Sequence, residues 1–501
     1  MHSIYLDPPE IQGQTVTFRW RITPETHLYR HNHFSFQFPD SVDLTRVPQR
    51  LWWDILLICL HAHWLLLRPC EIHLPIRLGA AERHFWLQHL RNGLDTLDGY
   101  RQTAAPSGPL DIDIVDGVLE CPRAIISGHG YGAAFSGGKD SLLQAGLLAE
   151  LTDRPLLVAT TSPLPPLEDH DTARREQVFA AIQARRPVRF VEVHSDLRAC
   201  WDNGFPYFAG YDVALNELTD THVYLGALLA TAAASGVTRL FLASEAELQE
   251  TVVIDGKIVQ FHHFMYSAAT QRSFSRLLAG YGISYGSLTW PLYSWQVQQL
   301  LWERYPDICD LQYSCWRVPA DRATCSECSQ CLRIALTALV AGRDPRSMGI
   351  DLPRLLAYAP QWEPMAPPAE GEIPRPRETV ARRAHALVQN AIRRTSLIYL
   401  TRLLTDGALW RVATKPVRDQ LAAFRVLRQR TPPTAAPPLG VREAFCEWLD
   451  PDLRDRLTEI YASHLGREPR ELHFATFDRS RVLTERATAP LDWTDADSYA
   501  A

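Results

Sequence analysis

The spacing of apolar residues changes along the chain and predicts how the chain is organised. Up to about residue 120, apolar and polar positions alternate in several short runs, the pattern of half-buried strands. These strands are predicted over Thr15–Ile22, Phe34–Phe38 and Cys70–Leu78, and the second is expected as an antiparallel partner of the first. A long apolar stretch, Val47–Leu67, predicts a helix between the second and third of them. We therefore expect residues 1–120 to form a separate small α+β unit, with Pro75 placing its strand at a sheet edge.

Between about residues 125 and 245, short apolar runs alternate with segments of helical periodicity. This alternation predicts an α/β fold, with a doubly wound parallel sheet covered by helices on both faces. The strands are expected over Ala133–Phe135, Pro155–Thr161, Val188–Val193 and Arg239–Ala243, and the helices over Asp140–Leu151, Thr172–Ala184 and Leu218–Ser235. Ligands of such sheets lie beyond the carboxyl ends of the strands. The expected lining is Ser136–Ser141, Thr160–Ser162, His194–Asp196 and Ser244–Glu247.

The remaining third is set apart by prolines and by charge. Residues 363–377 are rich in proline and predict a linker, and residues 378–501 show mainly helical patterning. Arg375–Arg430 carries 13 Lys and Arg against three acidic residues, a net charge of +10 in a chain whose total is −6. A basic helical face could hold RNA, a phosphate-rich ligand or an acidic partner, but a solvated surface is the commoner explanation, so nucleic acid is not the favoured partner.

Composition adds limits on the class of protein. Of the 501 residues, 46% are apolar and 22% charged, which is typical of a soluble globular chain of about three domains. Met1–Pro9 has neither a basic start nor an apolar stretch, so no targeting signal is expected. Leu51–Leu67 contains Asp54, His61 and His63, which favours a buried helix over a membrane span. We expect a cytoplasmic protein whose cysteines stay reduced.

A short glycine turn between a predicted strand and a predicted helix is the first candidate site. It reads Phe135-Ser136-Gly137-Gly138-Lys139-Asp140-Ser141. Two glycines permit a tight turn with exposed amides, and a helix N-terminus favours negative charge, so this turn can hold phosphate. The spacing fits neither a Walker A loop nor a dinucleotide fingerprint. An ordinary strand-to-helix turn is the alternative.

A cysteine cluster is the second candidate site. Its members are Cys315, Cys325, Cys328 and Cys331. Cys-x-x-Cys turns supply two sulfurs from one curl of backbone, and zinc prefers a tetrahedral set of such ligands. Because an all-cysteine set leaves no open position, the expected role is structural. An iron–sulfur cluster and a cluster without metal are the alternatives.

The glycine turn resembles the pyrophosphate loop, or PP-loop, of the N-type ATP pyrophosphatases, which cleave ATP to AMP and pyrophosphate. Together with the cysteine spacing, Ile125–Gly349 resembles the 7-cyano-7-deazaguanine synthase (QueC) family. The resemblance implies a PP-loop domain of the adenine nucleotide alpha hydrolase type over residues 121–350. ATP and Mg²⁺ would bind at Phe135, Ser136, Gly137, Gly138, Lys139, Asp140 and Ser141, and Zn²⁺ at Cys315, Cys325, Cys328 and Cys331.

The resemblance also implies a reaction. The family adenylates 7-carboxy-7-deazaguanine, adds ammonia and dehydrates the amide to the nitrile, and the catalytic residues here would be Ser136, Lys139, Asp140 and Ser141. Lys139 is the nearest candidate cation for the phosphates. By position, Thr160, Thr161 and Ser162 would contact the nucleoside, with helix caps or turn formers as the equal alternative.

The chain departs from the synthase in length and in its substrate segments. Thr160-Thr161-Ser162-Pro163 replaces an Asp-Tyr-Gly-Gln-Arg-like stretch, and Leu218-Thr219-Asp220-Thr221 replaces a Pro-Asn-Arg-Asn-like one. The long form is similar to the QueC-like proteins of anti-phage operons of the Qat and type IV CBASS kinds. That similarity implies a partner protein, encoded nearby, whose amino terminus accepts the deazaguanine in place of ammonia. A PP-loop enzyme acting on a tRNA base, and a nucleotide-binding assembly protein without catalysis, are the alternatives.

Overall fold

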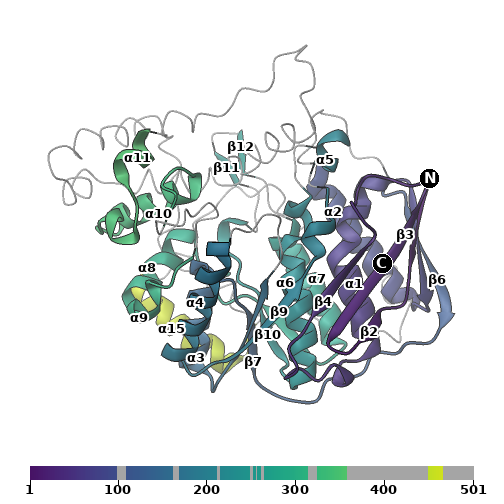
Figure 1. Cartoon of the computed structure of the whole chain (residues 1–501), viewed down its shortest axis with the longest axis horizontal. Coiled ribbons are helices and arrows are strands. Elements are labelled where there is room, and N and C mark those ends of the chain that lie inside the picture. The colour runs from purple at the N-terminus through teal and green to yellow at the C-terminus, as the bar shows by residue number, and fades with distance from the viewer. Residues whose placement is uncertain are drawn as a thin grey trace, which may run out of the picture.

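The computed structural model describes residues 1–98, 109–161, 169–202, 204–211, 215–248, 252–254, 257–260, 264–313, 324–357 and 449–465 (Figure 1). The expected linker over residues 363–377 and most of the expected C-terminal region over 378–501 lie outside these residues.

One large mixed sheet runs through the described part of the chain. It contains 11 strands in the order β13-β10-β7-β8-β9-β4-β3-β1-β5-β6, with β2 paired to β3. Its strands are β1 (His2–Leu6), β2 (Glu10–Gln12), β3 (Thr15–Thr23), β4 (His33–Gln37), β5 (Cys70–Ile76), β6 (Ile112–Leu119), β7 (Tyr131–Ala134), β8 (Leu156–Thr161), β9 (Arg189–Ser195), β10 (Arg239–Phe241) and β13 (Ser284–Gly286). A separate hairpin pairs β11 (Val252–Ile254) with β12 (Lys257–Gln260).

The block from β9 to β13 is parallel throughout, as the α/β prediction expects. Alternate residues of β8 face opposite sides: Leu156 and Val158 belong to one hydrophobic core, and Leu157 and Ala159 to the other. Helices therefore cover both faces. They are α1 (Gln49–Trp64), α2 (Ala80–Asp98), α3 (Lys139–Leu151), α4 (Asp169–Arg185), α5 (Phe205–Phe208), α6 (Asn216–Ser235), α7 (Ala268–Ala279), α8 (Ser294–Arg304), α9 (Pro306–Cys309), α10 (Ser329–Val340), α11 (Leu352–Ala357) and α15 (Pro451–Leu465).

The strand order reverses between β7 and β10. The chain passes from β7 outward to β8 and β9, then returns across the sheet to β10 and β13 on the other side of β7. In open α/β sheets a crevice forms at such a reversal, beyond the carboxyl ends of the strands, and ligands bind there. The glycine turn follows β7 directly, so it lies at this crevice.

The first 120 residues are continuous with the α/β block. The predicted antiparallel pairing of β3 with β4 is confirmed, but β4 also pairs with β9, through Phe36 opposite Ser195. The described part of residues 1–120 was expected to form a separate unit. In the structure it shares one sheet and one hydrophobic core with the α/β block. Gly226 of α6 shows how closely the parts approach, because a Cβ there would lie 3.1 Å from Ile55 Cγ2 of α1.

The prediction that Pro75 marks an edge strand is wrong. β5 lies between β1 and β6 and pairs in parallel with both. The pairing with β6 is irregular between Leu74 and Ile76, which flank the proline that has no N–H to donate. Gly117 of β6 lies against this irregularity, where a Cβ would fall 2.2 Å from the carbonyl oxygen of Pro75. The glycine and the irregular register together allow a proline inside the sheet.

The apolar helix near the N-terminus is a core helix, as the sequence predicts. Gln49–Leu67 is long and apolar enough to cross a membrane by length and composition, but 94% of its most apolar window is buried inside the protein. Its charged residue Asp54 accepts hydrogen bonds from Tyr281 Oη at 2.6 Å and Arg123 Nη2 at 3.1 Å. Arg50 and Glu82 complete a buried charge cluster at this point.

The final described helix, α15, packs on the α/β block rather than apart from it. Leu457 and Tyr461 are buried in the same core as Leu142 and Leu300. The Tyr461 hydroxyl donates to the Leu288 carbonyl at 2.6 Å. Figure 1 shows α15, in yellow, lying among α3, α8 and α9.

Candidate nucleotide and metal sites

The glycine turn has the backbone geometry that close contact with an anion requires. β7 ends at Ala134 and α3 begins at Lys139, with Gly138 as its N-cap. Gly137 has a φ of +78°, a left-handed conformation that costs glycine little and other residues more. A Cβ at Gly137 would also lie 3.2 Å from Val178 Cγ1 of α4. The turn therefore needs glycine at this position.

The two serines of the turn face each other across it. Ser141 Oγ donates to the Gly138 carbonyl at 3.0 Å, and it accepts from the Ser136 amide at 3.3 Å. Ser136 Oγ lies 3.3 Å from Ser141 Oγ and accepts from the Gly138 amide at 3.4 Å. These are long contacts for hydroxyl groups, so a phosphate oxygen could replace them with shorter bonds.

Lys139 does not extend into solvent toward an incoming phosphate. It is 4% exposed, and its Nζ donates to Asp140 Oδ1 at 2.7 Å and Oδ2 at 2.8 Å. It also forms an ion pair with Glu245 Oε1, a residue that follows β10 and is 3% exposed. The sequence predicts Lys139 as the nearest cation for the phosphates, whereas in the structure two carboxylates balance its charge.

Other cations lie beside the turn, and sequence reasoning missed them. The Tyr313 amide donates to the Gly137 carbonyl at 2.8 Å, which brings this tyrosine against the loop. The guanidinium groups of Arg174 and Arg175, in the first turns of α4, lie 5.4 Å and 5.6 Å from the Tyr313 ring centre. The sequence signal that could have identified them is a pair of adjacent arginines near the start of the helix that follows β8. That strand is the neighbour of β7, which leads into the glycine turn.

The ends of β8 and β9 supply part of the expected lining. Thr160 is 4% exposed, and its Oγ1 has no hydrogen-bond partner within the described residues. Thr161 Oγ1 lies 2.5 Å from His194 Nδ1 on the neighbouring strand. Ser162 lies outside the described residues. Asp196 has a structural role, because its Oδ1 accepts from the Ser35 amide of β4 at 2.6 Å.

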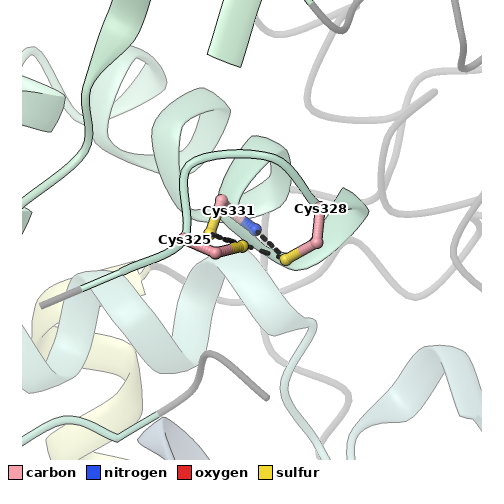
Figure 2. Close-up of side chains that lie close together, drawn as sticks. All are labelled: Cys325, Cys328 and Cys331. Atoms are coloured by element: carbon pink, nitrogen blue, oxygen red, sulfur yellow. Dashed lines mark hydrogen bonds between the residues drawn. The ribbon is translucent and has the colours of Figure 1, made fainter. Parts of the chain in front are cut away.

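The cysteine cluster gathers at the start of α10. Cys325, Cys328 and Cys331 bring their sulfurs together, as Figure 2 shows. The Sγ atoms lie 3.7 Å apart between Cys325 and Cys331, and 3.5 Å apart between Cys328 and Cys331. Sulfurs at about 2.3 Å from a tetrahedral zinc would lie about 3.8 Å apart. Cys315, the fourth predicted ligand, lies outside the described residues.

The backbone around these cysteines favours thiolates. The Glu327 amide donates to Cys325 Sγ and the Cys331 amide donates to Cys328 Sγ, each at 3.4 Å. Ser326, with a φ of +54°, makes the tight curl that brings two sulfurs to one side. The three described cysteines thus fit a zinc ion by spacing and by donor type.

The two sites are linked through the residue that pairs with Lys139. Glu245 Oε2 lies 3.9 Å from Nη1 of Arg333, which follows Cys331 by two positions on α10. Arg333 Nη2 donates to Gln330 Oε1 at 2.8 Å. The residues on both sides of the link, Lys139 and Cys331, are buried.

Comparison with known proteins finds no family whose model matches the chain, no matching curated protein and no matching solved structure. The structure bears out the α/β fold and, of the predicted four-cysteine zinc site, the gathering of the three cysteines that it describes.

Proposed function

We propose that this chain is an ATP-dependent, AMP-forming ligase that activates a 7-deazaguanine carboxylate and transfers it to an amine. The observation that carries the proposal is the turn after β7, with Gly137 in a left-handed conformation and two serine hydroxyls converging at the start of α3. Such a turn at a strand-order reversal is suited to phosphate binding. The turn belongs to a PP-loop domain in this proposal.

Activation begins when a carboxylate oxygen of the substrate attacks the α-phosphorus of ATP. An O–P bond forms, the bond from the α-phosphorus to the bridging oxygen breaks, and pyrophosphate leaves with the electron pair. The amides and hydroxyls of Ser136 to Ser141 would stabilise the charge that grows on the departing pyrophosphate. Arg174 and Arg175 would supply positive charge from the side of α4.

Magnesium would accompany the nucleotide. Asp140 is the carboxylate of the turn, and its side chain is 29% exposed, so it can exchange Lys139 for a hard cation. Thr160 and Thr161 would meet the nucleoside at the end of β8 with Ser162, as the resemblance implies. The unpartnered Oγ1 of Thr160, within the described residues, supports a polar ligand there.

Transfer completes the reaction. An amine nitrogen attacks the acyl carbon, an amide N–C bond forms, the acyl C–O bond to the phosphate breaks and AMP leaves, while the amine gives up a proton. The acceptor is either ammonia or the amino terminus of a protein encoded nearby. The zinc of the cysteine site would hold α10 in place and take no part in either step.

The deazaguanine substrate is supported by the pairing of the turn with the cysteine spacing. The proposal also places the enzyme in the cytoplasm, where thiols are reduced; of the described cysteines outside the cluster, Cys59, Cys70, Cys121, Cys200 and Cys309 are free thiols.

The test is a turnover assay with a mass readout. The purified chain is incubated with ATP, Mg²⁺ and 7-carboxy-7-deazaguanine, with ammonium or with proteins of neighbouring genes, while AMP is measured and intact protein masses are recorded. AMP formation that depends on the carboxylate supports the proposal, and a protein mass gain identifies the acceptor. S136A and D140N should each abolish AMP formation without lowering the thermal unfolding temperature by more than a few degrees.

Three outcomes would contradict parts of the proposal. Unchanged AMP formation in both variants would remove the turn from the active site. Turnover that requires RNA and falls steeply with salt would indicate a tRNA substrate. A chain that binds ATP without forming AMP under any of these conditions would be a nucleotide-binding assembly protein.

A further inference from the structure

One buried carboxylate connects the glycine turn to the cysteine cluster. Glu245 comes four residues after β10, on the carboxyl edge of the sheet, and is 3% exposed. Its Oε1 pairs with Lys139, the first residue of α3. Its Oε2 faces Arg333 of α10 at 3.9 Å. The same side chain thus contacts one cation from each site.

Arg333 is held in place by a residue next to the cysteine cluster. It lies two positions after Cys331, and its other terminal nitrogen, Nη2, donates to Gln330 Oε1 at 2.8 Å. Gln330 is 6% exposed and directly precedes Cys331, which is fully buried. One turn of α10 therefore carries a sulfur ligand, an amide and the guanidinium that faces Glu245. A displacement of this turn would move Arg333 with it.

Burial makes the charge balance around Glu245 matter. Charges out of water interact strongly, and a buried charge that loses its partner is costly. Without the carboxylate, Lys139 and Arg333 would be two cations with less negative charge between them, and the start of α10 would be held less firmly.

We infer that Glu245 is a positioning residue that couples metal retention by the cysteine cluster to occupancy of the glycine turn. The part of this inference that concerns nucleotide binding at the glycine turn rests on the proposed function. Phosphates arriving at the turn attract Lys139, and Glu245 then interacts more fully with Arg333, which holds α10 in place. Nucleotide should therefore slow metal loss, and by linkage metal should tighten nucleotide binding.

The first experiment needs no nucleotide. The zinc-loaded full-length chain is mixed with the chromophoric chelator 4-(2-pyridylazo)resorcinol, and the rate of zinc transfer is followed by absorbance. E245Q should release zinc about fivefold faster than wild type, or more. K139Q should instead slow release, because Glu245 is then left to interact fully with Arg333. The matched control is E150Q, which removes another ion-paired carboxylate, that of α3 with Arg304, and should release zinc at the wild-type rate.

Two results of this experiment would overturn the inference. One is zinc release from E245Q at the wild-type rate. The other is equal acceleration in E150Q, which would indicate general loosening of the fold. If E245Q does not fold, K139Q decides the comparison, because zinc release from K139Q at the wild-type rate or faster would overturn the inference.

The second experiment adds Mg-ATP at saturation. Zinc release from the wild type should slow about fivefold or more, and E245Q should show no such protection. Equal protection in both proteins would overturn the inference. If calorimetry shows that the wild type binds no ATP, the proposed function fails, while the rates without nucleotide still decide whether Glu245 supports the metal site.

Discussion

Lys139 and Glu245 form a buried ion pair across the crevice between β7 and β10, the point where the strand order reverses. Their side chains are 5% and 4% exposed, so neither can exchange its partner for bulk water without a rearrangement. The pair joins the helix that starts at the glycine turn to the segment after β10. The two halves of the α/β block are thus held together at the place where a ligand would bind.

Removing one member of this pair should cost more stability than removing both. E245Q should lower the free energy of unfolding by about 3 kcal/mol, because it removes a buried carboxylate that balances the charges of Lys139 and Arg333. The double variant K139M/E245M should recover more than half of that loss. Urea unfolding followed by circular dichroism measures both values. A double variant less stable than E245Q would contradict this account.

The stability of the fold should fall with acid because of buried histidines. Burial lowers the pKa of His61 to about 4 and of His63 to about 3, and it lowers the pKa values of His89 and His222 well below the usual range. All four side chains lie between the N-terminal helices and α6 and are at most 1% exposed. The folded chain therefore keeps these imidazoles neutral below pH 6.5, where the unfolded chain protonates them.

Above pH 6.5 these histidines are neutral in both states and contribute no pH dependence. Between pH 6.5 and about 4 the unfolded chain binds more protons, so stability should drop by about 1.4 kcal/mol per pH unit for each such histidine. Urea unfolding at several pH values measures the slope. H89F should flatten it, whereas H84Q, a change at an exposed histidine, should leave it unchanged; an unaltered slope in H89F would count against the assignment.

The arginines at the start of α4 should affect nucleotide use. R174Q and R175Q should each lower kcat/KM for ATP about tenfold or more, because a charge-assisted hydrogen bond to phosphate contributes about 1.5–3 kcal/mol. R185Q is the matched control at the other end of α4, where Arg185 pairs with Asp310. Steady-state AMP formation at varied ATP gives the comparison. Equal losses in all three variants would show a structural effect of α4.

Metal removal should destabilise the region around α10. The purified chain should contain one zinc ion, and C331S should lose it together with several degrees of thermal stability, because binding energy at a structural zinc site is folding energy. C309S changes a buried cysteine outside the cluster and should keep the zinc. Elemental analysis with thermal unfolding tests both. Full zinc content in C331S would show that the metal, if present, is held elsewhere.

The sequence predicted local features well and long-range pairings poorly. The β3–β4 pairing, the helix of the glycine turn and the end of α6 at Ser235 follow from nearby residues, and the structure confirms them. The gathering of Cys325, Cys328 and Cys331 follows from their spacing along one curl of backbone. In each case the signal lies within a few residues of the feature.

Other features depend on residues far apart in the chain. Nothing near Phe36 indicates that β4 pairs with β9, and nothing near Pro75 reveals the glycine at position 117 that tolerates it. Tyr313 reaches Gly137 across more than a hundred residues of sequence. The partner of Lys139 could not be predicted either, because Glu245 was one of several polar residues after a strand.

The pairing of β4 with β9 also sets an order of events during synthesis. The core around α1 includes Leu225, Leu228 and Leu229 of α6 and the strand residue Val193. When only the first 120 residues have left the ribosome, their fold is therefore incomplete. The edge of β4 that later pairs with β9 is exposed, and the face of α1 that later packs on α6 is uncovered. Such surfaces invite aggregation until their partners arrive. The N-terminal segment, made first, can complete its packing only when residues up to about Ser235, the end of α6, have left the ribosome.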